Sequence, residues 1–156
     1  MNDVRREKRS KLLIGWREWV HLPQLLPDPI KAKIDTGART SALHAYRIHE
    51  FSEHGVRHVE FVLHPQQQRR RPERICRAEV LDQRVITSSN GQRERRYVIA
   101  TTLYLGNMHW PIELTLTNRD TMSYRMLLGR EALRRRCLID PGRSFLQSLS
   151  TIDPPV

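Results

Sequence analysis

The sequence predicts a mostly β protein, a small closed β-barrel, with one short helix near the C-terminus. Turn signals recur at intervals of about eight to twelve residues, which is typical of small all-β folds. Between these turns, apolar and β-branched residues alternate with polar ones, as they do in half-buried strands. Residues 131–136 are the one segment with a convincing helical pattern.

The first half of the chain is expected to form four strands. Val59, Phe61 and Leu63 alternate at period two and give the clearest strand. Residues 23–29 contain three prolines and therefore predict a loop. The expected strands are residues 18–22, 30–34, 41–51 and 57–64.

The second half is expected to consist of hairpins. Asn90-Gly91 is a strong signal for a tight hairpin turn, and Gly106-Asn107 predicts another. Residues 65–72 are rich in Gln and Arg and predict an exposed loop. The expected strands are residues 74–80, 83–87, 96–105, 108–117 and 124–128, and residues 138–139 return to the sheet after the helix.

The length of 156 residues and the hydrophobic content of 38% fit one domain with a modest core. We place this domain at residues 12–147, between a charged flexible tail (1–11) and a C-terminal tail (148–156). No apolar run is long enough for a membrane span or for a signal peptide. We therefore expect a cytoplasmic protein without membrane association.

The chain is strongly basic, with 27 Lys and Arg against 17 Asp and Glu and a formal net charge of +10. Its arginines cluster at residues 69–71, 93–96 and 134–136. Such a surface attracts polyanions such as nucleic acid, acidic peptides or anionic lipid. A soluble arginine-rich surface without a specific partner is the alternative explanation.

Asp35-Thr36-Gly37-Ala38 is the most informative motif of the chain. An apolar strand runs into an aspartate, then a hydroxyl residue, then a glycine that lets the backbone turn. This is the layout of the catalytic loop of an aspartic protease. An ordinary turn or a helix N-cap would explain the same four letters.

A second motif, Met126-Leu127-Leu128-Gly129-Arg130, strengthens the catalytic interpretation. In each lobe of a retroviral-type protease, a short apolar strand ending in glycine lies beside the aspartate loop, because glycine permits close backbone approach. A buried strand that ends at a glycine before a helix is the alternative. Asp140-Pro141-Gly142 is a poor second catalytic motif because proline lacks the threonine hydroxyl.

Over residues 12–145 the chain resembles a bacterial family labelled ATP-dependent zinc proteases. Its members are retropepsin-like proteins often associated with ATP-grasp glutamate ligases of the kind that modify a ribosomal protein. The resemblance is carried by residues 14–20, 32–38, 88–91, 113–116 and 126–130. It implies a barrel of the retropepsin type and an aspartic peptidase.

That chemistry needs two carboxylates that share one proton, so one motif per chain implies a homodimer with Asp35 as the catalytic residue of each copy. The resemblance implies that Thr36, Gly37 and Ala38 support the catalytic loop. It also implies that Leu127, Leu128, Gly129 and Arg130 pack beside it. For Arg130 we favour an ion pair that braces the loop.

The ligase association suggests a glutamate-rich tail of a cytosolic or ribosomal protein as substrate. A flap is also needed, and residues 65–72 and 88–93 are the two hairpin tips available. The candidate substrate-binding residues are Arg39, Arg69, Arg70, Arg71, Ser89 and Asn90.

We expect no cofactor and no metal, despite the zinc label. No His-Glu-x-x-His motif and no phosphate-binding P-loop are present, and the histidines are scattered. Cys76 and Cys137 are expected to be buried apolar residues. The alternative function is a non-catalytic module that binds an acidic peptide, an ATP-grasp ligase or, if the protein is ribosome-associated, RNA.

Overall fold

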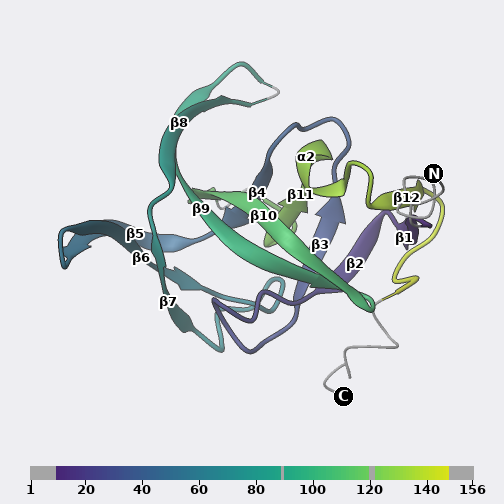
Figure 1. The fold of residues 1–156 in the computed structure, drawn as a ribbon, viewed down its shortest axis with the longest axis horizontal. Coiled ribbons are helices and arrows are strands. Elements are labelled where there is room, and N and C mark those ends of the chain that lie inside the picture. The colour runs from purple at the N-terminus through teal and green to yellow at the C-terminus, as the bar shows by residue number, and fades with distance from the viewer. Residues whose placement is uncertain (1–9, 89, 120–121, 148–156) are drawn as a thin grey trace, which may run out of the picture.

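The structure is a computed structural model that describes residues 10–88, 90–119 and 122–147, which form three sheets and one short helix (Figure 1). A seven-stranded sheet occupies the centre, and its strands follow the order β2-β3-β11-β4-β10-β9-β8. A three-stranded sheet, β5-β6-β7, lies on one side of it, and the parallel pair β1 and β12 lies on the other.

The bounds of the elements are β1 (Leu12–Gly15), β2 (Arg17–Val20), β3 (Ile30–Ile34), β4 (Ser41–His44), β5 (Tyr46–Glu53), β6 (Val56–Leu63), β7 (Arg74–Glu79), β8 (Asp82–Thr87), β9 (Arg93–Leu105), β10 (Met108–Thr117), β11 (Met126–Leu128), α2 (Arg130–Leu133) and β12 (Cys137–Asp140). The mostly β class and the short C-terminal helix are therefore confirmed.

The closed barrel is wrong, because the three sheets are open. In the large sheet, β2 and β8 form opposite edges and are not paired with each other. An isolated bridge between His21 and Tyr104 joins the end of β2 to β9, but it does not extend into a ladder. Alternation along a strand identifies its buried face and says nothing about its neighbours, so closure was not determined by the pattern.

Three local predictions differ from the structure. Residues 41–51 form two strands, because the chain leaves the seven-stranded sheet after His44 and enters the three-stranded sheet at Tyr46. The helix ends at Leu133, because Arg134 leaves the helical region with a ψ of 131° and Arg135 has a φ of +67°. β1 was not predicted, because a strand of four residues is too short to show an alternating pattern of apolar and polar residues.

The buried apolar side chains form one cluster that spans the large sheet and the three-stranded sheet. Phe61 and Leu63 of β6 are buried in it together with Leu43 of β4, Leu114 of β10 and Leu128 of β11. This packing holds β4, which follows the Asp35 loop in the chain, and β11, which pairs with both β3 and β4. No helix in the described ranges has the length and apolar content that crossing a bilayer requires.

Glu18 anchors the segment that follows β12 onto the β1–β2 corner. Its carboxylate is fully buried and accepts hydrogen bonds from the backbone N–H groups of Gly15 (2.7 Å), Leu146 (2.7 Å) and Gln147 (3.1 Å). Buried carboxylates require such partners, so these three bonds hold two distant parts of the chain together.

Candidate functional site

Asp35 lies where the central strands of the large sheet end. β11 pairs in parallel with β3, with Leu128 opposite Ile34, and antiparallel with β4. The Asp35 N–H donates to the Leu128 carbonyl at 2.8 Å and so continues this ladder by one bond. The two motifs found in the sequence are therefore neighbours in the fold.

The loop holds one oxygen of the Asp35 carboxylate in place. The Gly37 N–H donates to Asp35 Oδ1 at 3.1 Å, and the Ala38 N–H donates to the Asp35 carbonyl at 3.2 Å. Asp35 is half-buried, whereas Thr36 and Gly37 are exposed. Within the described ranges Asp35 Oδ2 has no hydrogen-bond partner, so one carboxylate oxygen is left for chemistry or for a second chain.

The segment after β11 braces the loop through its backbone. The Arg130 N–H donates to the Ala38 carbonyl at 2.8 Å, and the Arg130 guanidinium donates through Nη1 to the Thr36 carbonyl at 2.9 Å. Arg130 therefore supports the loop through a carbonyl, not through the ion pair that we expected. Arg39 points toward Glu131, with 3.4 Å between Nε and Oε2, and 74% of its side chain is exposed.

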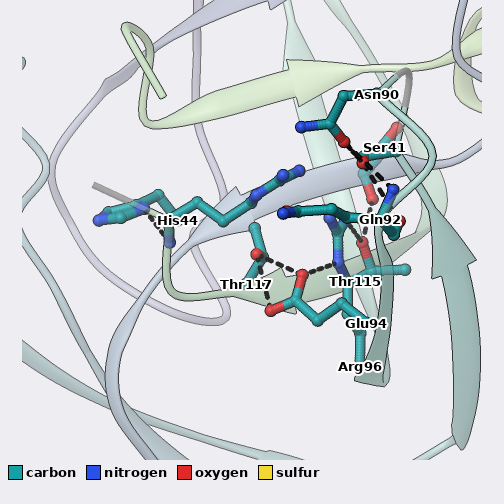
Figure 2. A network of polar contacts seen from close by, with 10 residues as sticks. Ser41, His44, Asn90, Gln92, Glu94, Arg96, Thr115 and Thr117 are labelled. Carbon is teal, nitrogen blue, oxygen red and sulfur yellow. Dashed lines mark hydrogen bonds and ion pairs between the residues drawn. The ribbon is translucent and has the colours of Figure 1, made fainter. Parts of the chain in front are cut away.

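A polar network that includes Ser41, Arg96 and Thr115 (Figure 2) reaches the segment after β11 through Gly129. The Gly129 N–H donates to Ser41 Oγ at 3.0 Å, and the Thr115 hydroxyl donates to the Ser41 carbonyl at 3.0 Å. Arg96 donates through Nη1 to Thr115 Oγ1 at 3.2 Å and through Nε to Glu94 Oε1 at 2.8 Å. The network therefore connects β9 to the Gly129 backbone.

Arg96 is a member of this network that the sequence does not single out. It stands in a run of arginines that predicts surface charge, yet its side chain is only 7% exposed. The available signal was strand alternation, since Arg96 is on the same face of β9 as Val98, which is opposite Thr115.

Arg96→Met is expected to lower the free energy of unfolding by about 2 kcal/mol, because Glu94 and Thr115 lose a charged partner. Urea unfolding measures this loss. Arg84→Met is the matched control, because Arg84 makes two exposed ion pairs, with Asp82 and Glu113, that are worth less than about 1 kcal/mol. Equal losses in both variants would contradict a structural role for the buried network.

The β8–β9 hairpin rises at the same end of the molecule as the loop that joins β3 to β4, both at the top of Figure 1. Its tip is a tight turn, in which the Ser88 N–H donates to the Gln92 carbonyl at 2.8 Å and Gly91 has a φ of +86°. Asn90 lies in this turn and accepts a hydrogen bond from the Gln92 N–H. Ser89 lies outside the described residues.

The structure does not bring Arg69, Arg70 and Arg71 to the Asp35 loop. The Arg69 carbonyl accepts from Arg125 Nη2 at 3.1 Å, and Arg125 precedes the end of β11 that is remote from Asp35. Arg70 and Arg71 line an open cavity with Glu73. A hydrogen bond from His64 and the nearby Arg47 and Arg71 charges lower the pKa of Glu73.

No group of three or more His, Cys, Asp or Glu side chains in the described ranges could hold a metal ion. The two histidines spaced four apart illustrate why: His54 lies in the β5–β6 turn with a φ of +53°, whereas His58 lies within β6. The Asp35 loop therefore presents a carboxylate without an accompanying ligand set.

The two thiols are held protonated by burial, which raises the pKa of Cys76 to about 12 and that of Cys137 to about 11. Cys76 is buried as expected, whereas Cys137 is only partly buried. Unfolded thiols ionise near pH 8.5, so above this pH the unfolded chain binds fewer protons than the folded one. The free energy of unfolding should therefore fall as the pH rises from about 8 to 10.

Urea unfolding across this pH range measures the fall, and a Cys76→Ala/Cys137→Ala variant should show a shallower slope. A slope that is identical in the variant would show that the thiols are not its source.

Comparisons with known proteins identify the family. The family model described as RimB-like, retropepsin-like aspartic endopeptidase RimB, matches residues 13–149. The zinc-protease label finds no support in this match. A crystal structure of a protein of unknown function from Legionella pneumophila has a TM-score of 0.74 at 27% identity, with 89% of this chain and all of that chain covered.

Curated relatives carry a different name. Proteins named probable alpha-L-glutamate ligase from Shewanella pealeana and Desulfotalea psychrophila are 51% and 47% identical over 87% and 85% of this chain. The chain spans only about 30% of the length of these relatives. The matched segment contains both motifs of the Asp35 site, and the chain therefore belongs to the RimB-like family of retropepsin-like aspartic endopeptidases.

Proposed function

We propose that the protein is a homodimeric aspartic peptidase in which Asp35 of each copy contributes one carboxylate to a shared site. The observation that carries this proposal is the Asp35 loop itself. Three backbone hydrogen bonds hold it: the Asp35 N–H donates to the Leu128 carbonyl, the Ala38 N–H to the Asp35 carbonyl and the Arg130 N–H to the Ala38 carbonyl, while Thr36 and Gly37 remain exposed. A rigid loop that exposes its glycine is suited to meeting an identical loop across a two-fold axis.

Two such carboxylates about 3 Å apart cannot both ionise, so the pair holds one proton. The ionised member takes a proton from a water molecule, whose oxygen attacks the peptide carbonyl carbon, and the protonated member donates its proton to the carbonyl oxygen. Collapse of the tetrahedral intermediate breaks the C–N bond, and a proton passes to the leaving nitrogen. No covalent enzyme intermediate forms.

The β8–β9 hairpin is the flap of this proposed enzyme. Of the two hairpin tips in the sequence, the one with Asn90 and Gly91 projects at the Asp35 end of the large sheet, whereas the loop after β6 is tied to the other end through Arg125. The network of Arg96 and Thr115 supports the base of the hairpin on the strand that follows the Asp35 loop.

A glutamate-rich tail on a cytosolic protein, ribosomal proteins included, is the proposed substrate. The relatives named as glutamate ligases support this choice, as does the net charge of +10. Arg39 lies four residues after Asp35 with its side chain exposed, so it is placed to attract a substrate carboxylate. The proposed place of action is the cytoplasm.

A non-catalytic role is the second candidate, and the lengths of the relatives favour it. Because proteins named as ligases contain a region similar to this entire domain, the domain could serve as a docking module for an ATP-grasp ligase. In that role, Asp35 would be a structural turn residue.

The test is cleavage of a protein with a C-terminal glutamate tail, followed by mass spectrometry, with and without a chelator. The proposal expects cleavage that a chelator does not affect and a specific activity that rises with protein concentration as dimers form. Sedimentation measures the dimer. A protein that stays monomeric at every concentration would contradict the peptidase and favour the docking module.

A further inference from the structure

A basic surface lies around the turn between α2 and β12. We call it the α2–β12 pocket and define it by Lys11, Arg134, Arg135 and Arg136. These cations line a cavity of about 830 Å³ together with Trp110 of β10. In Figure 1 the turn between α2 and β12 lies on the right, near β1, whereas the β8–β9 hairpin rises at the upper left.

Backbone hydrogen bonds bring these four residues close together in the fold. The Leu12 N–H donates to the Arg136 carbonyl at 2.8 Å, which places Lys11 beside the arginine run at the start of the β1–β12 ladder. The Arg134 N–H donates to the Arg130 carbonyl at 2.9 Å, and the Arg136 N–H donates to the Leu133 carbonyl at 3.0 Å. The pocket is therefore a built feature of the turn.

Among the described residues, these cations have no carboxylate partner, whereas several other arginines do. Arg57, Arg74, Arg77, Arg84 and Arg96 each form an ion pair with Asp or Glu. In the described ranges, no ion pair involves the four cations of the α2–β12 pocket.

The carboxylate that lines this pocket, Glu131, lies 3.4 Å from Arg39 and is directed to that residue. Four positive charges line this cavity against the one carboxylate of Glu131, so the pocket attracts an external polyanion.

Arg136 indicates what kind of polyanion fits. Its guanidinium lies over the Trp110 ring at 5.3 Å from the ring centroid, and the Trp110 indole N–H is fixed by a 2.8 Å hydrogen bond to the Ala132 carbonyl. The guanidinium is thus held next to an aromatic ring, while Arg136 remains only partly buried in the pocket wall. Nucleic-acid bases stack on guanidinium planes, which the carboxylates of an acidic peptide cannot do.

We propose that the α2–β12 pocket binds single-stranded RNA, with Lys11, Arg134 and Arg135 on phosphates and Arg136 under a base. This interaction is sequence-independent because its contacts are to phosphates and to the face of a base. It does not depend on Asp35, so it stands or falls separately from the peptidase.

The experiment measures the anisotropy of a fluorescein-labelled oligouridylate titrated with the full chain at several salt concentrations. Each phosphate contact contributes about 0.7 to the salt slope of a single strand. Arg134→Ala/Arg135→Ala should therefore reduce the slope by about 1.4 and the affinity about 20-fold near 0.1 M salt. Both side chains are exposed, so the variant should fold, and its melting temperature verifies this.

Arg70→Ala/Arg71→Ala is the matched control. These arginines are also adjacent and exposed, and they line an open cavity of about 840 Å³. There, two cations share the cavity with Glu73, whereas four cations share the α2–β12 pocket with Glu131. The control removes the same charge, so it should leave the affinity within about threefold. Arg136→Lys should keep the salt slope and weaken binding about fivefold or more through lost stacking.

Three results would overturn the proposal. The oligouridylate does not bind, the two double variants weaken binding equally, or poly-L-glutamate binds in its place with the same dependence on Arg134 and Arg135. The last result would assign the pocket to an acidic peptide. An Asp35→Asn variant should bind RNA like the wild type, whatever its effect on cleavage.

Discussion

Asp35→Asn is expected to reduce the turnover of a glutamate-tailed substrate by roughly 10²- to 10⁴-fold, the range of a general acid–base contribution. The amide keeps the shape of the side chain, and its oxygen can still accept the 3.1 Å hydrogen bond from the Gly37 N–H. It cannot take a proton from water, so the pair of residues loses its base. KM and the free energy of unfolding should change little, and single-turnover cleavage measures the loss.

The control for this substitution is Asp140→Asn. Asp140 accepts a hydrogen bond from the Gly142 N–H at 3.0 Å, so it has the same local turn as Asp35 with Gly37, but it lies at the end of β12. Cleavage should be unchanged in this variant. Cleavage that survives Asp35→Asn and disappears with a chelator would show metal chemistry, and the aspartic mechanism would be wrong.

Gly129→Ala is expected to destabilise the protein by about 3 kcal/mol and to disturb the Asp35 loop. A Cβ at this position would lie 2.5 Å from the Thr40 carbonyl oxygen and 2.9 Å from that of Arg39. Both contacts are to backbone, which cannot rotate away as a side chain would, so β11 or the loop must move. Urea unfolding measures the loss of stability, and amide hydrogen exchange measures the loosening of residues 35–41.

Gly142→Ala is the matched control for this second prediction. A Cβ at Gly142 would meet Asp140 Oδ1 at 3.5 Å, an ordinary van der Waals contact, so the free energy of unfolding should stay within about 0.5 kcal/mol. A Gly129→Ala variant as stable as this control would show that the close approach of β11 to the loop is not needed for the fold.

The predictions that the structure confirmed came from patterns among neighbouring residues in the sequence. The alternation of Val59, Phe61 and Leu63 identified β6, and Asn90-Gly91 identified the turn between β8 and β9. Both signals come from neighbouring residues, so tertiary packing was not needed to read them. The break at Ala45 was missed because it depends on which sheet each strand joins. The early end of α2 was missed because it depends on the backbone angles of Arg134 and Arg135, which residue type does not indicate.

For the candidate site, too, some features could be predicted from the sequence and others could not. The order of the two motifs, with Asp35 after one apolar strand and Gly129 after another, is visible in the sequence. So is the large positive charge. Each of these is a property of consecutive residues or of composition.

Contacts between residues that are far apart in the sequence became known only from the three-dimensional fold. In the fold, the Asp35 N–H donates to the Leu128 carbonyl and the Arg96 side chain is buried. The large sheet is open, although the sequence pattern predicted a closed barrel. The fold also gave some arginines carboxylate partners and gathered others in the α2–β12 pocket. Which strands pair, and which carboxylate an arginine contacts, depend on how distant segments of the chain are aligned with each other. Alternation along one strand does not encode that alignment.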